Sequence, residues 1–325
     1  MLRIGIPSAF FYYVHYPMWK TFFEELNVQV VTSGKTTRQI VDNGVREALA
    51  DACVPVKVYF GHVIDLYNKV DYLFIPRIVC LNKKTVYCPK FLGLPDMIRY
   101  GIANMPPVID VRIDARSRKD SLFAAFHKVG KMLGKTPLQI NKAIIKAKIC
   151  QHNFQKLLSS GFQPIEAINN IFAGQVTKPP SQLEQLKFAV VGYPYIIHDQ
   201  YISVDIINKL RKMGISVITS DNISNLILRL QPRVAAKHLF WTFSERTLRA
   251  TSHFARRKDI DGIIHMSAFG CGPDSIVDRY IQLDNYSSKI PFLRLVIDEL
   301  SGVAGVSTRL EAFVDMVKRK KRGMP

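Results

Sequence analysis

The chain has 325 residues, of which 48% are hydrophobic and 22% charged, a balance that excludes a disordered protein. Its 45 Lys and Arg residues against 26 Asp and Glu residues give a formal net charge of +19, which points to acidic partners. The N-terminal MLRIGIP has no secretion signal, and no stretch approaches the roughly 18–20 apolar residues of a membrane span. We therefore expect a cytoplasmic protein without a membrane anchor.

The chain contains an internal repeat, in which the same order of predicted strands and helices occurs twice. The segment 2–33 (LRIGIPSAFFYYVHYPMWKTFFEELNVQVVTS) matches 186–220 (LKFAVVGYPYIIHDQYISVDIINKLRKMGISVITS) as strand, Tyr-rich loop, helix and strand. Further matches pair VDYLFIPRIVC with IDGIIHMSAFGC, and PPVIDVRID with IPFLRLVIDE, at offsets of about 185–190 residues. A constant offset of this kind indicates an internal duplication.

Short β-branched runs that alternate with helical patterns predict an α/β fold with parallel sheets. We expect an α/β lobe at 1–115, a helical connector at 116–184 and a second α/β lobe at 185–325. Within the connector, 121–135 and 138–162 have the 3.6-residue apolar spacing of helices, and Gln175–Gln182 reads as the linker into the second lobe. Loops at the carboxyl ends of the strands are where parallel sheets bind ligands.

Five cysteines in a reducing compartment call for a role other than disulfides. Cys53 follows an amphipathic helix at 40–52 that Pro55 is expected to end, and Cys80 and Cys88 flank the loop CLNKKTVYCPK. A proline directly after a cysteine, as at Cys88, is common around iron–sulfur clusters. The spacing fits neither a zinc ribbon nor a ferredoxin run, although zinc stays open. The alternative for each thiol is a buried apolar cysteine.

Cys271 has the most specific context, in FGCGPDS. The glycines Gly270 and Gly272 on either side would let backbone N–H groups approach the sulfur, and Asp274 with Ser275 is expected to cap the next helix. Cys150, in contrast, lies among apolar residues at helical spacing and is interpreted as core packing.

Polar residues near these cysteines complete the predicted site. His62 could transfer protons near a cluster, or be a satisfied core histidine. Lys57 and Lys90 each follow a cysteine closely and could offset the negative charge of a cluster.

The motifs CVPVKVYFGHV, VDYLFIPR, CPKFLGLPD, FGCGPDS and DELSGVAGVSTRLEAF together cover nearly the whole chain. In these motifs the chain resembles the uncharacterised domain associated with acyl-CoA dehydratase activases, which is similar to the iron–sulfur subunits of 2-hydroxyacyl-CoA dehydratases and to double-cubane cluster proteins. The resemblance implies Rossmann-like lobes with a cluster between them and electrons supplied by an ATP-hydrolysing activator. A homodimer and an acyl-CoA-type ligand are further expectations of this kind.

The metal ligands expected are Cys53, Cys80, Cys88 and Cys271, and four thiolates match a single [4Fe–4S] cluster better than a double cubane. In the repeat, Cys80 is aligned with Cys271, which favours it as a ligand. With Cys80 the cluster is closed and suits low-potential electron transfer or reductive activation. Without it, one iron is open to a small acyl thioester in a dehydratase or reductase.

A basic binding module with structural zinc is the third reading of the sequence. Eleven basic and two acidic residues lie between Arg112 and Lys156, and the chain ends in KRKKRGMP. No recognised nucleic-acid-binding motif accompanies them, so nucleic acid is disfavoured against a solvated face or an acidic electron-transfer protein. The sequence also lacks the GxxxxGK[ST] phosphate loop, which places ATP hydrolysis on another protein.

Overall fold

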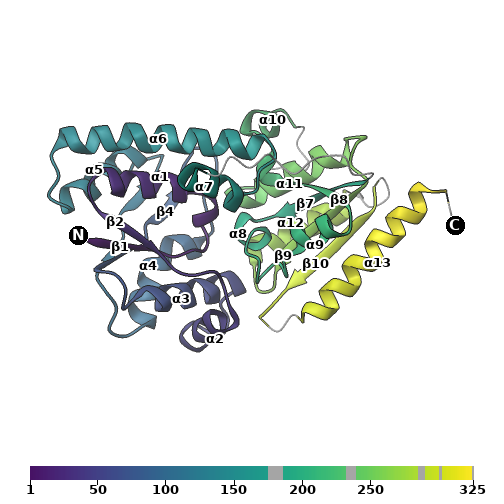
Figure 1. The fold of residues 1–325 in the computed structure, drawn as a ribbon, viewed down its shortest axis with the longest axis horizontal. Helices are drawn as coiled ribbons and strands as arrows, with labels where there is room; N and C mark the ends of the chain where they lie inside the picture. Colours follow the sequence, from purple (N-terminus) through teal and green to yellow (C-terminus); the bar gives the residue numbers. More distant parts are fainter. Residues whose placement is uncertain (175–185, 232–238, 285–289, 300–301, 324–325) are drawn as a thin grey trace. The chain divides into compact units, whose positions relative to one another are not determined.

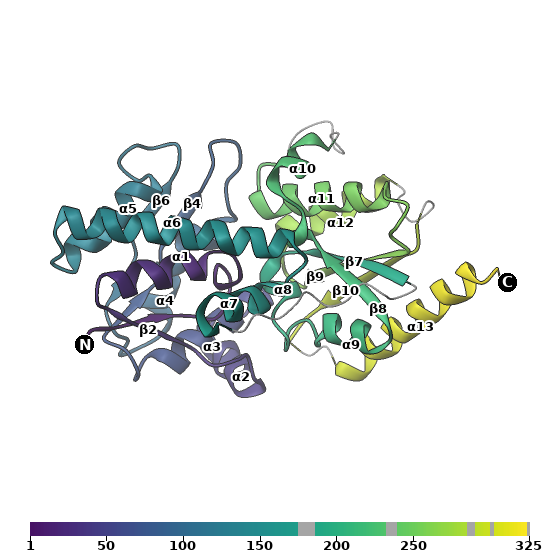
Figure 2. The same ribbon diagram turned by 45° about the horizontal axis from the view of Figure 1, so that its top comes forward.

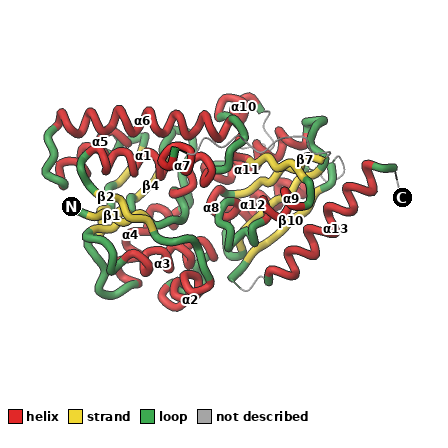
Figure 3. Tube along the Cα trace, viewed as in Figure 1, coloured by secondary structure: helices red, strands yellow, loops and turns green. Residues whose placement is uncertain are grey.

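The computed structural model describes residues 1–174, 186–231, 239–284, 290–299 and 302–323. Helices and strands alternate along these residues, and parallel strands are flanked by helices (Figures 1 and 3). The predicted linker Gln175–Gln182 lies outside the described residues. The predicted α/β class with parallel, Rossmann-like sheets is confirmed.

The chain divides into two units. Unit 1 comprises Met1–Lys156, Ala167–Gln175 and Phe240–Thr242, and unit 2 comprises Leu157–Glu166, Val176–Leu239 and Phe243–Pro325. This division passes through the expected connector 116–184, because most of its helical residues pack on unit 1. Each unit is described separately below.

Unit 1 is built on a four-stranded parallel sheet in the order β2-β1-β3-β5, beside a two-stranded parallel sheet of β4 and β6. Its elements up to residue 114 are β1 (Arg3–Ile6), α1 (Tyr12–Glu25), β2 (Gln29–Thr32), α2 (Arg38–Glu47), α3 (Val54–Leu66), β3 (Tyr72–Phe74), β4 (Arg77–Cys80), α4 (Pro89–Gly101), β5 (Val108–Ile109) and β6 (Arg112–Asp114). The central strand β1 pairs on both edges, with Ile4 opposite both Val30 and Tyr72.

Unit 2 contains a four-stranded parallel sheet in the order β10-β9-β7-β8. Its elements are β7 (Leu186–Gly192), α8 (Pro194–Ile197), α9 (Ile206–Lys212), β8 (Ile215–Thr219), the 3-10 helix η1 (Ser220–Asn222), α10 (Asn225–Leu230), α11 (Thr242–Ala255), β9 (Gly262–Ala268), α12 (Gly272–Leu283), β10 (Phe292–Ile297) and α13 (Val303–Lys321). Strand β9 is buried along its whole length, as expected for a central strand covered on both faces.

The two sheets have the same topology, which confirms the internal duplication. Read from the opposite edge, the second sheet runs β8-β7-β9-β10, the counterpart of β2-β1-β3-β5. One hydrogen bond is also repeated: the Arg3 amide donates to the Asp71 carboxylate at 2.8 Å, and the Lys187 amide donates to the Asp261 carboxylate at 2.8 Å. In both units, therefore, an aspartate just before the third strand holds the start of the first.

The duplication corrects the sequence alignment of the cysteines. Each unit joins its third strand to its fourth through one long helix, α4 in unit 1 and α12 in unit 2. Cys88 directly precedes α4 and Cys271 directly precedes α12, whereas Cys80 belongs to the additional strand β4. The counterpart of Cys271 is thus Cys88. The sequence alignment of Cys80 with Cys271 is wrong because unit 1 contains the extra strand β4, which ends at Cys80.

The core of unit 1 is strongly aromatic. Trp19 of α1 lies 4.5 Å from Phe74 and 4.7 Å from Phe126 between ring centroids, and Phe22 lies 4.5 Å from Phe126. These side chains are 4% exposed or less, and burial of each contributes about 1.5–3 kcal/mol. Helix α1 is thereby fixed between the main sheet and the helices of the connector.

The predicted connector helices are confirmed as α5 (Leu122–Met132) and α6 (Pro137–Ser159), followed by α7 (Pro164–Ala173). Helix α6 runs beside α1 and α5 in both ribbon views (Figures 1 and 2). The Gln151 side chain donates to the Val14 carbonyl at 2.9 Å, and His127 meets Asn141 at 3.0 Å. These contacts attach α6 to unit 1 through one of its faces.

Helices α2 and α3 pack backbone against backbone through two glycines. A Cβ atom on Gly44 would lie 1.9 Å from the Lys57 carbonyl oxygen, and one on Gly61 would lie 1.9 Å from the Ile40 carbonyl oxygen. Only glycine allows this approach. The close contact fixes α3, which begins next to Cys53.

Candidate functional site

Cys53 occupies the N-cap position of α3, with Pro55 in the first turn. The prediction that Cys53 follows the end of a helix is therefore wrong, because Cys53 directly precedes the start of one. Helix α2 already ends at Glu47, and Pro55 starts a new helix instead of ending the old one, because proline is tolerated in a first turn. The Val56 amide donates to the Cys53 carbonyl at 2.9 Å, which closes that turn.

Cys88 has the same local structure at the start of α4, with Pro89 as the first helical residue. The loop before it is anchored in unit 1 by Val86, whose amide donates to the Phe240 carbonyl and whose carbonyl accepts from the Thr242 amide, both at 2.7 Å. The Thr85 and Thr242 hydroxyls are 2.9 Å apart. The loop that precedes Cys88 is thus held by hydrogen bonds to Phe240–Thr242.

The Cys53 and Cys88 thiols lie in one electrostatic environment. Burial raises the pKa of each, the nearby Cys88 raises the pKa of Cys53 further, and the Lys90 ammonium lowers the pKa of both. The backbone N–H groups of Val56 and Lys90 also lower these pKa values. Lys90 is thereby placed beside both thiols, where its charge favours thiolates.

Cys271 is the N-cap residue of α12 and is buried, with Pro273 in the first turn. Gly270 before it has φ +75°, a left-handed conformation that favours glycine, while Gly272 opens the helix. The prediction that Asp274 and Ser275 cap this helix is wrong. The helix begins two residues before Asp274, and the Ser275 hydroxyl instead donates to the Cys271 carbonyl at 3.0 Å.

Cys53, Cys88 and Cys271 therefore share one arrangement: each directly precedes a helix, and each helix has a proline in its first turn. A helix N-terminus carries partial positive charge and unpaired N–H groups, which stabilise a thiolate. Three of the chain's five cysteines occupy this position, and sequence spacing alone did not show it.

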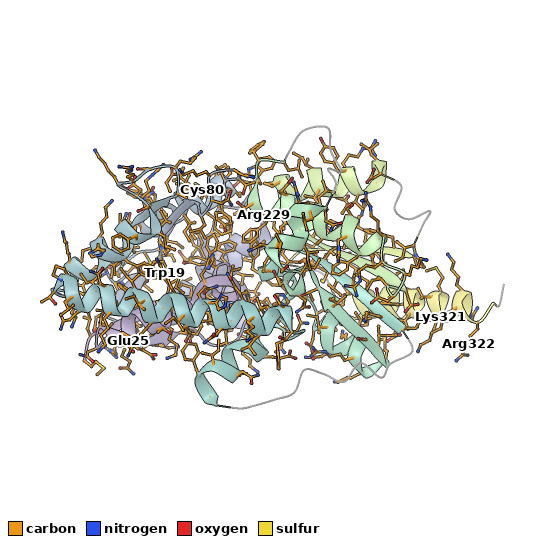
Figure 4. The ribbon with its side chains drawn as sticks, turned by 90° about the horizontal axis from the view of Figure 1, so that it is seen from above. Trp19, Glu25, Cys80, Arg229, Lys321 and Arg322 are labelled. Atoms are coloured by element: carbon orange, nitrogen blue, oxygen red, sulfur yellow. The ribbon has the colours of Figure 1, made fainter. Side chains whose placement is uncertain are left out.

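Cys80 is held differently. It ends β4, is fully buried, and its thiol donates to the Asp114 carboxylate at 3.1 Å (Cys80 is labelled in Figure 4). Burial and Asp114 raise the pKa of Cys80, and the Arg116 guanidinium, which donates to Asp114 at 3.0 Å, keeps that carboxylate ionised. The protonated thiol is therefore the favoured form of Cys80.

His62 and Lys57 both lie inside α3. The two His62 ring nitrogens are 2.8 Å from the Ser33 and Thr36 hydroxyls, and burial lowers the pKa of His62 to about 4. The neutral ring joins α3 to the end of β2, as a core histidine does. Lys57 is 7% exposed, and its carbonyl receives the close approach of Gly44.

Cys150 lies on α6, where α6 faces α1. It is half-buried, burial raises its pKa, and the Thr21 hydroxyl lowers it. Its surroundings are those of a packing residue.

Aromatic side chains form a wall beside Cys53 and Cys88. Phe10 lies 5.1 Å from Tyr59 and 4.7 Å from Phe91 between ring centroids, and Phe91 lies 5.9 Å from Tyr87. Phe10 itself has φ +51°, a strained conformation for a bulky residue. An apolar pocket lies beside this wall at the carboxyl ends of β1 and β3, and Cys53 and Cys88 themselves are half-buried.

A buried ionic cluster in unit 2 escaped prediction. His265 of β9 lies 3.5 Å from the Asp274 carboxylate and 3.6 Å from the Asp278 carboxylate, both on α12. His265 and Asp274 are fully buried, and Arg294 of β10 donates to Asp278 at 2.7 Å. Burial opposes a charged ring, but the two carboxylates raise the pKa of His265 to about 9. A single histidine in the apolar run IDGIIHMSAF was the available signal.

Within the described residues, no three side chains of His, Cys, Asp or Glu converge as ligands of a metal ion. Cys53 and Cys88 are near enough for Cys88 to raise the pKa of Cys53, and Lys90 lowers the pKa of both thiols. Sulfur donors, helix N-termini and an aromatic surrounding are the chemistry that an iron–sulfur cluster requires. This pair therefore fits two ligands of such a cluster, and the predicted position of a cluster between the lobes stays a prediction.

The family profile of the CoA enzyme activase uncharacterised domain matches residues 3–223, about two thirds of the chain. The chain belongs to this family. The match covers all the helices and strands of unit 1 and, in unit 2, the strands β7 and β8. The resemblance to the activase-associated domain is thereby confirmed for residues 3–223, whereas the motifs FGCGPDS and DELSGVAGVSTRLEAF lie beyond the match.

No curated protein matches the chain. Among solved structures, a crystal structure of ZnuA aligns over 98% of both chains with 10% identity and a TM-score of 0.26. That score supports no common fold. In the described part of the chain, no helix has the length and hydropathy needed to cross a membrane.

Proposed function

We propose that this member of the CoA enzyme activase-related family is a [4Fe–4S] protein that acts in low-potential electron transfer or reductive activation. The observation that carries the proposal is the shared arrangement of Cys53, Cys88 and Cys271 at helix N-termini. These three thiolates are the proposed ligands in either form of the cluster, and the closed, electron-transferring form takes the Cys80 thiolate as its fourth ligand. Lys90 offsets part of the charge of Cys53 and Cys88.

The chain's own residues would control the environment of the cluster. Helix dipoles and backbone N–H groups favour the thiolate forms, and second-shell donors of this kind tune the reduction potential. The wall of Phe10, Tyr59, Tyr87 and Phe91 would form an apolar side of the site near the two half-buried cysteines of unit 1. Charge, hydrogen bonds to the sulfurs and solvent exposure together set the reduction potential of such a cluster.

The proposed partner is an ATP-hydrolysing activator or another acidic electron-transfer protein. The family description contains the term activase, and the chain has no phosphate loop of its own. Its +19 charge favours association with an acidic surface. A cytoplasmic location and a homodimer belong to the same proposal.

The contact between Cys80 and Asp114 favours a second candidate function. A thiol that donates a hydrogen bond is protonated, and a ligand would have to be a thiolate. If Cys80 stays protonated, three protein thiolates remain, and the cluster would offer an open iron to the oxygen of a small acyl thioester. The protein would then be a dehydratase or reductase component.

Strictly anaerobic purification followed by iron, sulfide and EPR measurements tests the proposal. We expect about four irons and four sulfides per chain, the composition of one [4Fe–4S] cluster. A colourless, iron-free protein would contradict the proposal. Zinc in place of iron would support the structural-zinc alternative instead.

A further inference from the structure

We infer that α5 and α6 form a docking surface for an acidic protein. We call this surface, made of the outward sides of residues 121–156, the lysine ridge. The docking surface is inferred from the composition and exposure of these residues alone. Only the role of the partner, delivery of electrons, rests on the proposed function.

The Lys, Arg, Asp and Glu side chains of the α5–α6 segment are all positive. Residues 121–165 contain seven lysines and no Asp, Glu or Arg. Two of the lysines pair with acidic residues outside the segment: Lys128 with Asp120 at 2.9 Å, and Lys146 with Glu25 at 2.7 Å (Glu25 is labelled in Figure 4). Lys142 and Lys148 form no ion pair with any described residue, so their charges are available to a partner.

Large apolar side chains lie between these charges. On α6, Leu138 is 82% exposed, Ile145 60% and Ile149 56%. Their spacings of seven and four residues place them on one face of the helix, and Lys142 lies on that same face.

The opposite face of α6 packs against the core of unit 1. Ile140, Ala143, Ile144, Ala147 and Phe154 are 3% exposed or less and pack into unit 1. The outer apolar residues are therefore not required for the fold, and a solvated face would not need three aliphatic side chains in line. They indicate a surface that is covered by another molecule.

The chemistry of the ridge favours a protein as the occupant. Aliphatic side chains within a charged rim are the composition of a protein interface, and lysines would steer an acidic partner toward it. Nucleic-acid surfaces commonly add arginine and several stacking aromatic side chains to their lysines, whereas residues 121–156 contain no arginine and Phe123 is the one Phe, Tyr or Trp exposed there. A membrane-binding face would not carry Lys142 in the middle of its apolar stripe.

Titration of the full chain with flavodoxin, an acidic electron-transfer protein, tests this assignment. We expect binding that weakens as salt rises, and a loss of about tenfold or more in affinity for the double variant K142E/K148E. The variant I145S/I149S should also weaken binding while keeping the salt dependence. A matched control, K212E/K258E, changes the net charge equally at exposed lysines of unit 2 and should leave the affinity within about threefold.

Three outcomes would overturn the inference: no binding of flavodoxin, equal losses in ridge and control variants, or tighter ridge-dependent binding of a single-stranded RNA or of phosphatidylserine vesicles. Circular dichroism of each variant checks that the fold is kept. The titration is repeated on protein with and without iron. If the chain takes up no iron even under anaerobic conditions but still binds through the ridge, the docking surface is supported and the proposed cluster is contradicted.

Discussion

Cys88 and Cys271 occupy equivalent positions in the two units of the chain. Each is the residue before the helix that joins the third strand of the sheet to the fourth, and each has a proline in the first turn of that helix. A duplicated fold has therefore kept a thiol at the same helix N-terminus in both copies. Cys53 adds a third thiol of this kind, at the helix that precedes the third strand of unit 1.

Replacement of any of these three cysteines by serine should remove the cluster. Cys53→Ser, Cys88→Ser and Cys271→Ser each replace a thiolate donor by a hydroxyl that iron binds poorly. We expect iron per chain after anaerobic purification to fall by at least about half.

Cys150→Ser is the matched control, because Cys150 lies on α6 in a packing environment. It should retain the iron content of the unmodified chain. Equal iron loss in all four variants would show that the loss follows from general destabilisation and not from ligation.

Cys80→Ser separates the two candidate functions, and the protonated Cys80 thiol of the structure predicts that the cluster is kept, as the open-iron function requires. Serine can still donate to Asp114, so the buried contact that the Cys80 thiol makes at 3.1 Å is preserved. Iron content and the EPR signal should match those of the unmodified chain. Loss of iron in this variant alone would assign Cys80 as the fourth ligand and favour a closed, electron-transferring cluster.

Gly44→Ala and Gly61→Ala should each destabilise the protein by about 2–4 kcal/mol, since the added methyl group meets a backbone carbonyl that cannot move aside. Urea unfolding measures the change. Gly93→Ala on α4 is the control: a Cβ there meets nothing within 4 Å, and alanine should raise stability by about 0.5–1 kcal/mol. A neutral Gly44→Ala would disprove the close helix contact.

His265 should make stability depend on pH. Its pKa is raised in the folded state to about 9 from an ordinary value of 6.5, so the folded protein binds the proton more tightly. The contribution is complete below pH 6.5 and is lost as the pH rises through 9, and it amounts to about 3 kcal/mol. Urea unfolding at pH 6, 7.5 and 9.5 should show this loss, and His265→Gln should remove it. His127→Gln, outside this cluster, should leave the pH profile unchanged.

The sequence by itself determined the architecture. Alternating β-branched runs and helical periods require parallel α/β units, and the constant offset between LRIGIP and LKFAVV revealed the duplication. The apolar spacing of 121–135 and 138–162 predicted α5 and α6, because helix periodicity is a local property. The motifs also led to the correct family.

Only the tertiary structure decided which cysteines are alike. Spacing aligned Cys80 with Cys271, but β4 is an insertion whose pairing with β6 depends on residues more than thirty positions away. Likewise, the contact of His265 with Asp274 depends on α12 packing on β9, and the hydrogen bonds that hold His62 come from the end of β2. Side-chain partners are set by packing between elements distant in sequence, whereas the order of those elements is set locally.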